Sequence, residues 1–324
     1  MLKRILAAAA LAALGLIALA PVVAQGIDDP TPLPTVGTPL PLVTPTPVPR
    51  PQPARVVEEN GLLLALYFTN LPQGQTGLIE VRGSGLAGAR ARFLNGLVDF
   101  FRGGDGGLYA LLSVSMEQSP RVYDLAVFGW DAAGQRATVS TQVEVVTGGF
   151  IRQDITMAPD RAYLVDAEIE RAELARLESI FGNHTAERLW ESDGFMIPIL
   201  GSSLTSPFGA FRTFNGTLQT RHTGWDIRTT LGVPVLVSAA GQVAFAGRLD
   251  IRGNMVAVNH GAGVYSTYSH LSQIHVTRGQ TVVRGQIIGV TGDTGRSSGP
   301  HFHWEIAVNG NFVDSVQFTN MWLP

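Results

Sequence analysis

The chain has 324 residues, 45% hydrophobic and 15% charged, with a formal net charge of −3 and no cysteine. This composition is typical of a chain that buries a core and excludes a largely disordered protein. The balanced charge offers no basic surface for nucleic acid, and the absence of cysteine excludes disulfides, thiolate metal sites and a cysteine nucleophile.

The N-terminus has the features of an export signal. Lys3 and Arg4 precede an apolar run from position 5 to 20, and Val22-Val23-Ala24 supplies small residues suited to cleavage. Residues 1–24 are therefore predicted to be a signal peptide, and the protein to be exported. The alternative is an uncleaved anchor, since positions 5–24 just reach the ~20 apolar residues that span a bilayer. A membrane partner is expected only in that case.

Residues 25–55 are predicted to be a linker. Prolines recur through this segment in a background of Thr, Val and Leu. Proline lacks a backbone donor and favours the extended polyproline II conformation. We expect a spacer without chemistry of its own.

Residues 56–148 are predicted to form an all-β module. Short runs rich in β-formers occur at 62–69, 77–82, 108–113 and 122–130, and residues 136–146 alternate apolar and polar side chains. In the last run, Val139, Val143 and Val145 fall on one face. Glycine-rich turns separate the runs, which is typical of an Ig-like antiparallel β-sandwich. No catalytic spacing of His, Asp or Glu appears here, so a packing or spacing role is expected.

Residues 149–194 are predicted to be a connector that contains a helix at 166–181. Asp166 is a candidate N-cap and Gly182 a candidate end. Apolar residues repeat at helical spacing on the expected buried face: Ile169, Ala172, Leu177, Ile180 and Phe181.

Residues 195–324 are predicted to be a second β-rich domain. Candidate strands lie at 233–237, 242–246, 254–259, 265–269, 287–291 and 303–308. Asn309-Gly310 is a strong hairpin signal.

Six of the seven histidines follow position 220, in this last domain. His222 and Asp226 flank Gly224, which favours a turn that leads into a strand and brings both side chains toward one point. His301 and His303 lie two apart in a predicted strand, so both face one side while Phe302 and Trp304 face the core. The glycine-rich loop 292–300 before them lacks the Gly-Lys-Ser/Thr ending of a phosphate loop and is expected to shape one wall of a cleft.

Two histidines and one aspartate would provide three protein ligands and leave a fourth position open, which is the pattern of a catalytic zinc. His270, at the end of a predicted strand, and one further histidine would then handle protons near neutral pH. Each motif is weak by itself. Their joint occurrence in one β domain is the stronger signal.

Residues 200–315 resemble the lysostaphin-type (LytM-like) zinc peptidases. The matching stretches include Ser206-Pro207-Phe208-Gly209, His222-Thr223-Gly224-Trp225-Asp226, Asn259-His260-Gly261, Tyr268-Ser269-His270-Leu271 and Gly299-Pro300-His301-Phe302-His303-Trp304-Glu305. The N-terminal β module and helix also resemble the region ahead of this domain in some members, without a motif to carry over.

The resemblance implies metal ligands at His222, Asp226 and His303 for Zn²⁺, and catalytic histidines at His270 and His301. The implied architecture is mainly β: an N-terminal Ig-like β-sandwich, a connecting helix and a C-terminal antiparallel β-sheet zinc peptidase domain. Which histidine is the general base stays open. His260 is expected to serve structure and His275 to lie on the surface, and His184 is assigned no function.

The resemblance further implies a zinc metalloendopeptidase that cuts stem peptides or cross-bridges of peptidoglycan, in the envelope or the surroundings of a bacterial cell. Its partners would be peptidoglycan peptides and not nucleic acid. The alternative is a non-catalytic scaffold of the same fold that activates a separate cell-wall amidase. All five implied site positions are intact here, which favours the enzyme.

Overall fold

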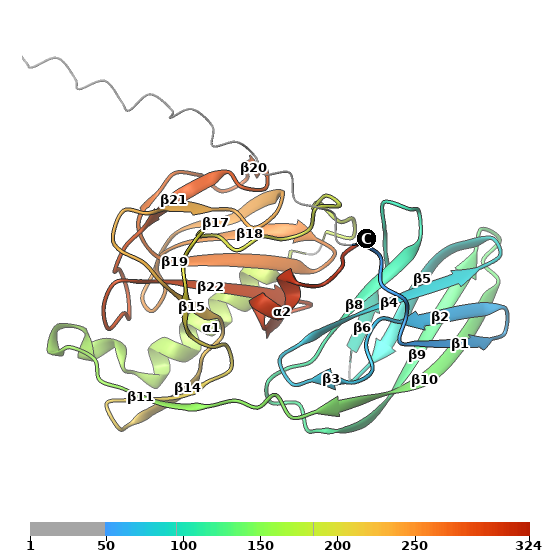
Figure 1. Ribbon diagram of the computed structural model, residues 1–324, viewed down its shortest axis with the longest axis horizontal. Coiled ribbons are helices and arrows are strands. Elements are labelled where there is room, and N and C mark those ends of the chain that lie inside the picture. The colour runs from blue at the N-terminus through green and yellow to red at the C-terminus, as the bar shows by residue number, and fades with distance from the viewer. Residues whose placement is uncertain (1–48, 95, 184) are drawn as a thin grey trace, which may run out of the picture. The chain divides into compact units, whose positions relative to one another are not determined.

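The computed structural model describes residues 49–94, 96–183 and 185–324 (Figure 1). The predicted signal peptide, most of the predicted linker and His184 lie outside these residues. Within the described residues, no helix has both the length and the hydropathy needed to cross a membrane.

Two facing sheets form the N-terminal half. The first sheet contains, in spatial order, β1 (Arg55–Glu59), β2 (Leu62–Leu66), β4 (Thr76–Gly83), β8 (Leu108–Ser113) and β7 (Phe101–Arg102). The second contains β3 (Leu71–Pro72), β10 (Arg136–Val146), β9 (Arg121–Asp131), β5 (Leu86–Phe93) and β6 (Gly96–Asp99). Val139, Val143 and Val145 are buried in the core of this half, as their alternation predicts.

Strand β5 was not predicted from the sequence. Its buried side chains Ala89, Ala91 and Phe93 alternate with the exposed Arg90 and Arg92, so the period of two is present. Alanine and glycine have low β-propensity, which hides such a strand when β-formers are sought. The pairing of β5 with β9 on one side and β6 on the other overrides that propensity.

The connector contains β11 (Arg152–Ile155), the 3₁₀ helix η1 (Pro159–Leu164) and α1 (Ala167–Phe181). The predicted helix is confirmed, with Asp166 as its N-cap accepting from the backbone N–H groups of Glu168 and Ile169. The predicted buried face is wrong at one position: Ala172 is exposed, and Glu173 is buried instead. The reason is an ion pair that the sequence does not reveal, between Glu173 and Arg252.

A small sheet joins the connector to the C-terminal half. It contains β11, β13 (Phe211–Phe214) and β14 (Leu218–Arg221), with β11 parallel to β13. Strand β11 was not predicted, because Arg152-Gln153-Asp154-Ile155 has no apolar alternation. Through this strand, Gln153 lines the groove that contains the candidate site.

The C-terminal half is built on one large antiparallel sheet. Its main path is β12 (Leu204–Ser206), β15 (Trp225–Arg228), β22 (His301–Val308), β19 (Val264–Ile274), β18 (Gly253–Gly261), β17 (Gly241–Leu249) and β20 (Thr281–Val282). Off this path lie β16 (Pro234–Leu236), β21 (Ile287–Thr291) and β23 (Asn311–Val313), and the short helix α2 (Ser315–Thr319) follows. The mainly β architecture is confirmed.

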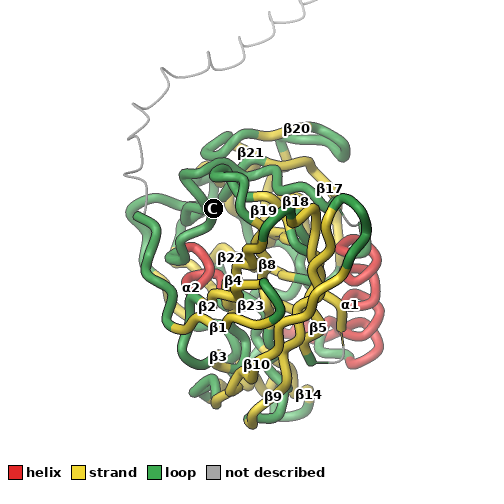
Figure 2. Tube along the Cα trace, turned by 90° about the vertical axis from the view of Figure 1, so that its right-hand side faces the viewer, coloured by secondary structure: helices red, strands yellow, loops and turns green. Residues whose placement is uncertain are grey.

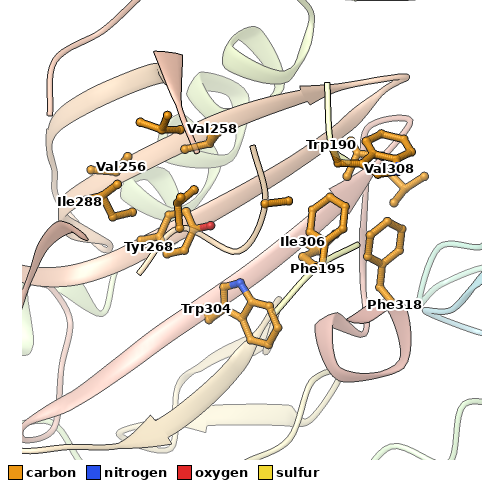
Figure 3. Packing of buried hydrophobic residues seen from close by; sticks show 14 of the residues in the cluster. Trp190, Phe195, Val256, Val258, Tyr268, Ile288, Trp304, Ile306, Val308 and Phe318 are labelled. Atoms are coloured by element: carbon orange, nitrogen blue, oxygen red, sulfur yellow. The ribbon is translucent and has the colours of Figure 1, made fainter. Parts of the chain in front are cut away.

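The large sheet is covered on both faces. One face carries a core that includes Tyr268, Trp304, Phe195 and Phe318, the last two in edge-to-face contact (Figure 3). Helix α1 flanks the sheet near β17 (Figure 2), where Leu177 and Ile180 pack against Met255 and Ala257 of β18. The predicted Asn309-Gly310 hairpin joins β22 to β23, and both residues have positive φ angles of 50° and 80°.

The two halves share buried contacts. Tyr109 and Leu111 of β8 belong to the same hydrophobic cluster as Trp190 and Phe318 of the C-terminal half. Gln317 of α2 pairs with the backbone of Thr76 in both directions, at 3.1 and 3.0 Å. All described residues accordingly belong to one compact unit.

Candidate metal centre and active site

Two neighbouring strands place three of the candidate side chains. Strands β15 and β22 are antiparallel, with Asp226 directly opposite His303. His222 lies just ahead of β15, and the turn between them passes so close to β22 that a Cβ on Gly224 would lie 2.3 Å from the Trp304 carbonyl oxygen. Glycine is therefore needed at the turn that brings His222 back over Asp226.

The structure brings His222, Asp226 and His303 together as one buried group. Asp226 Oδ1 lies 3.1 Å from His222 Nε2 and 2.9 Å from His303 Nδ1, and the two ring nitrogens are 3.1 Å apart. Ligand atoms on one face of a tetrahedral zinc site lie roughly 3.3 Å apart, given metal bonds of ~2.0–2.2 Å. The triangle of donor atoms therefore has nearly the size that zinc requires.

The other ring nitrogens fix which atoms carry lone pairs. His222 Nδ1 lies 2.7 Å from the Pro207 carbonyl oxygen, and His303 Nε2 lies 3.2 Å from Glu305 Oε1. Each of these nitrogens must donate its proton outward, so His222 Nε2 and His303 Nδ1 present lone pairs to the centre. Three acceptors that face one another require a cation between them, and this donor set fits zinc.

The titration behaviour of the group agrees with this arrangement. Burial lowers the pKa of His222 to about 4, whereas Glu305 and Asp226 outweigh burial and raise the pKa of His303. Burial raises the pKa of Asp226, but His222, His303 and Arg212 outweigh it and hold that pKa well below its usual value. Asp226 is thus an anion, as a carboxylate ligand of a metal must be.

Arg212 supports Asp226 from the side away from the centre. Its Nη2 donates to Asp226 Oδ2 and to Ser206 Oγ, and its Nε donates to Gln153 Oε1. Because Oδ2 is engaged in this way, Oδ1 remains directed at the two histidines. The sequence analysis did not single out Arg212, since an arginine in a short hairpin strand carries no motif.

His270 and His301 lie together beside this group. Their ring centroids are 4.7 Å apart, and His301 Nε2 is 3.6 Å from Asp226 Oδ1. His270 has a φ of +59° at an irregularity in the pairing of β19 with β18, which turns its side chain out of the regular strand alternation. The sequence predicted His301 and His303 on one strand face, whereas the convergence of His270 depends on this backbone irregularity.

The glycine-rich loop 292–300 holds both of these histidines. His270 Nδ1 lies 2.7 Å from the Thr294 carbonyl oxygen, and His301 Nδ1 lies 2.9 Å from that of Gly299. Each Nδ1 therefore carries the proton, which leaves Nε2 as a lone-pair nitrogen able to accept a proton. The loop also contributes to the wall of the cleft, as its composition predicts.

A groove of about 600 Å³ opens over the group. Its lining includes the site histidines, the loop 292–300 and residues of the connector such as Gln153 and Met157. A groove of this size accommodates a peptide segment next to the donor atoms.

The remaining predicted histidines lie elsewhere. His260 is fully buried in β18, between the Ala240 carbonyl oxygen at 2.8 Å and Ser266 Oγ at 2.7 Å. His275 is exposed. The sequence analysis assigned no role to Glu305, although its spacing of two from His303 in a strand places it on the same face.

Comparisons with known proteins find relatives of the C-terminal half. The model of peptidase family M23 matches residues 220–315. The chain is 42% identical over 131 residues to the DD-carboxypeptidase/endopeptidase Mpg of Neisseria meningitidis, covering 40% of this chain and 30% of that protein. It is 42% identical over 96 residues to the peptidoglycan DD-endopeptidase ShyA of Vibrio cholerae, covering 30% and 22%. The chain thus spans less than a third of the length of these relatives.

A solved structure matches more of the chain. The crystal structure of a Pseudomonas aeruginosa protein assigned to peptidase M23 is 28% identical, with a TM-score of 0.58. The match covers 76% of this chain and 94% of that one, so it extends well beyond residues 220–315.

Proposed function

Residues 220–315 belong to peptidase family M23, and from this premise we propose that the protein is a zinc metalloendopeptidase that hydrolyses peptide bonds in peptidoglycan. The observation that carries the proposal is the donor triangle of His222, Asp226 and His303 next to two proton-accepting histidines in an open groove. Relatives named as peptidoglycan DD-endopeptidases support the substrate class. We further propose that the protein acts in the cell envelope.

In this proposal His222 Nε2, Asp226 Oδ1 and His303 Nδ1 hold the metal. A bound zinc ion supplies Lewis acidity, which polarises a scissile carbonyl group and acidifies a water molecule. Arg212 keeps Asp226 oriented through Oδ2, and the Pro207 carbonyl keeps His222 in the required tautomer. These contacts hold the donors in place before substrate arrives.

His270 and His301 handle the proton and the developing negative charge. Each has Nδ1 bound to a carbonyl of the neighbouring loop and Nε2 unprotonated. One of them accepts the proton of the attacking water and passes it to the leaving amine. While it carries that proton, after the attack and before the amine leaves, it stabilises the tetrahedral oxyanion by hydrogen bonding.

The alternative role, a non-catalytic activator of a separate amidase, is less well supported. Such a role requires neither the donor triangle nor the paired histidines. Both features are present among the described residues, which favours the enzyme.

The test is a set of single alanine variants on the full chain, with purified peptidoglycan as substrate. We expect His222→Ala and His303→Ala to lose stoichiometric zinc and reduce cleavage by at least ~1000-fold, since each removes one of three ligands. His270→Ala and His301→Ala should keep zinc and lose about 100-fold or more in kcat. Mass spectrometry of the released muropeptides identifies the bond that is cut.

His275→Ala is the matched control, because it removes an exposed histidine away from the groove. Cleavage by His222→Ala at the wild-type rate would rule out the proposed metal site. A wild-type protein that binds no zinc and cuts nothing would instead favour the activator role.

A further inference from the structure

A buried carboxylate lies behind one of the proposed metal ligands. Glu305 is fully buried on the same face of β22 as His303, and its Oε1 lies 3.2 Å from His303 Nε2. A carboxylate that accepts from the outer nitrogen of a histidine fixes the ring orientation and makes the inner nitrogen more basic. Glu305 therefore acts on the atom that faces the metal position.

Four donors hold Glu305 in place. Arg252 Nε donates to Oε2 at 2.9 Å while its Nη2 donates to Oε1, and the hydroxyl groups of Thr223 and Thr267 donate to the same two oxygens. These four donors and the paired guanidinium are the partners that a carboxylate anion requires, and Glu305 cannot rotate without breaking several of the hydrogen bonds.

Helix α1 supplies the last partner. Arg252 is itself buried, and its Nη1 donates to Glu173 Oε1 at 3.0 Å. The backbone N–H groups of Ile251 and Arg252 also donate to Glu173, at 2.7 and 3.0 Å. Glu173 therefore fixes both the main chain and the side chain of Arg252, from a helix that precedes the matched residues 220–315.

We propose that Glu173, Arg252 and Glu305 form a buried ion-pair chain that positions His303 for metal binding. Helix α1 then contributes to the metal centre through Glu173. This inference rests on the proposed function. Burying the Arg252 guanidinium against a helix without a carboxylate would carry a large desolvation cost. Glu173 and Glu305 bind it from opposite sides and hold it in a fixed position. The connector is then more than a spacer between the two halves.

The test measures zinc affinity of the full chain by competition with a chromophoric chelator. We expect Glu305→Gln to weaken zinc binding by 10- to 100-fold, the usual effect of losing an outer partner of a ligating histidine. Glu173→Gln, which lies one step further away, should weaken it by roughly 3- to 10-fold. The matched control is Glu168→Gln, the same change at an exposed position of the same helix, which should have no effect.

Cobalt substitution separates positioning from mere stability. The visible absorption bands of the Co²⁺-loaded protein report ligand geometry, and they should shift in Glu305→Gln and Glu173→Gln but not in Glu168→Gln. If Glu305→Gln does not fold, Thr267→Val removes one hydrogen bond to the same carboxylate with little change in volume. It should then give the same direction of change in affinity and spectrum.

Unchanged zinc affinity and cobalt spectra in both glutamine variants would overturn the ion-pair chain, provided that His303→Ala loses the metal. If the wild type binds no zinc, or if His303→Ala binds it normally, the proposed function itself fails. The two failures are therefore distinguishable.

Discussion

Backbone carbonyl groups set the chemistry of the site residues. At His222, His270 and His301, Nδ1–H donates a hydrogen bond to a carbonyl oxygen, which leaves Nε2 with its lone pair. His303 is the exception, because Glu305 engages Nε2 and Nδ1 faces the centre. Four chemically identical side chains thus differ in which nitrogen they present, and the difference arises entirely from the partner of the other nitrogen.

His260 gives a prediction for stability against pH. Burial lowers its pKa from 6.5 to about 4, so the folded protein keeps it neutral while the unfolded chain protonates it. Above pH 6.5 the residue is neutral in both states and does not lower the free energy of unfolding. As the pH falls from 6.5 toward 4, protonation of the unfolded chain lowers that free energy by about 3 kcal/mol. We expect the free energy of unfolding of His260→Gln to decrease less steeply with falling pH over this range than that of the wild type. Urea titration at several pH values measures it.

The same change at the exposed His275 is the control, and His275→Gln should leave the pH dependence as in the wild type. An equally steep loss of stability in His260→Gln would show that other groups account for it.

At the scale of elements, strand β22 and helix α1 carry most of the site's organisation. Strand β22 presents His301, His303 and Glu305 on one face, through its period of two, and buries Phe302 and Trp304 on the other. Helix α1 contributes no ligand, yet its Glu173 lies in the ion-pair chain described above. The position of α1 therefore matters for chemistry that takes place in the sheet.

The start of α1 gives a prediction at this scale. Asp166 Oδ1 accepts from the backbone N–H groups of Glu168 and Ile169, so Asp166→Ala leaves both donors without their cap. We expect a loss of about 1 kcal/mol in the free energy of unfolding, by chemical denaturation. Asp166→Asn keeps an oxygen acceptor and should stay close to the wild type. Equal stability of Asp166→Ala and Asp166→Asn would contradict the capping role.

At the scale of the whole molecule, the two halves share one hydrophobic cluster. Tyr109 and Leu111 of the N-terminal half pack with Trp190 and Phe318 of the C-terminal half, and Gln317 pairs with the backbone of Thr76. We retain the predicted division into a β-sandwich of residues 56–148, a connector of 149–194 and a peptidase domain of 195–324 as a proposal about organisation. The shared cluster indicates that these parts are coupled in stability.

This coupling predicts a single unfolding transition. Leu112→Ala removes a fully buried side chain from the N-terminal core and should cost about 2–5 kcal/mol. Four of the five tryptophans lie in the C-terminal half and Trp130 lies in β9, so tryptophan fluorescence reports mainly on the C-terminal half. If the halves unfold together, the midpoint of its thermal transition falls by the same amount as the calorimetric Tm. Leu97→Ala, at an exposed position, is the control. An unchanged C-terminal transition in Leu112→Ala would indicate independent halves.

Local patterns in the sequence determined the mainly β architecture and the capped helix. The strands at 108–113 and 136–146 and the hairpin at Asn309-Gly310 follow from alternation and turn chemistry, which are local properties. The sequence also grouped His222, Asp226, His301 and His303 as candidates, because their spacings place them at a turn and on one strand face.

Only the tertiary structure decided which long-range partners these residues have. The pairing of β15 with β22 sets Asp226 against His303, and the φ of His270 depends on its place in the sheet. Arg212 and the Glu173–Arg252–Glu305 chain carry no local pattern, and Ala172 was predicted on the face where Glu173 is buried. A buried charge is stable only opposite its partner, and that partner lies far away in sequence, so neither periodicity nor composition can reveal it.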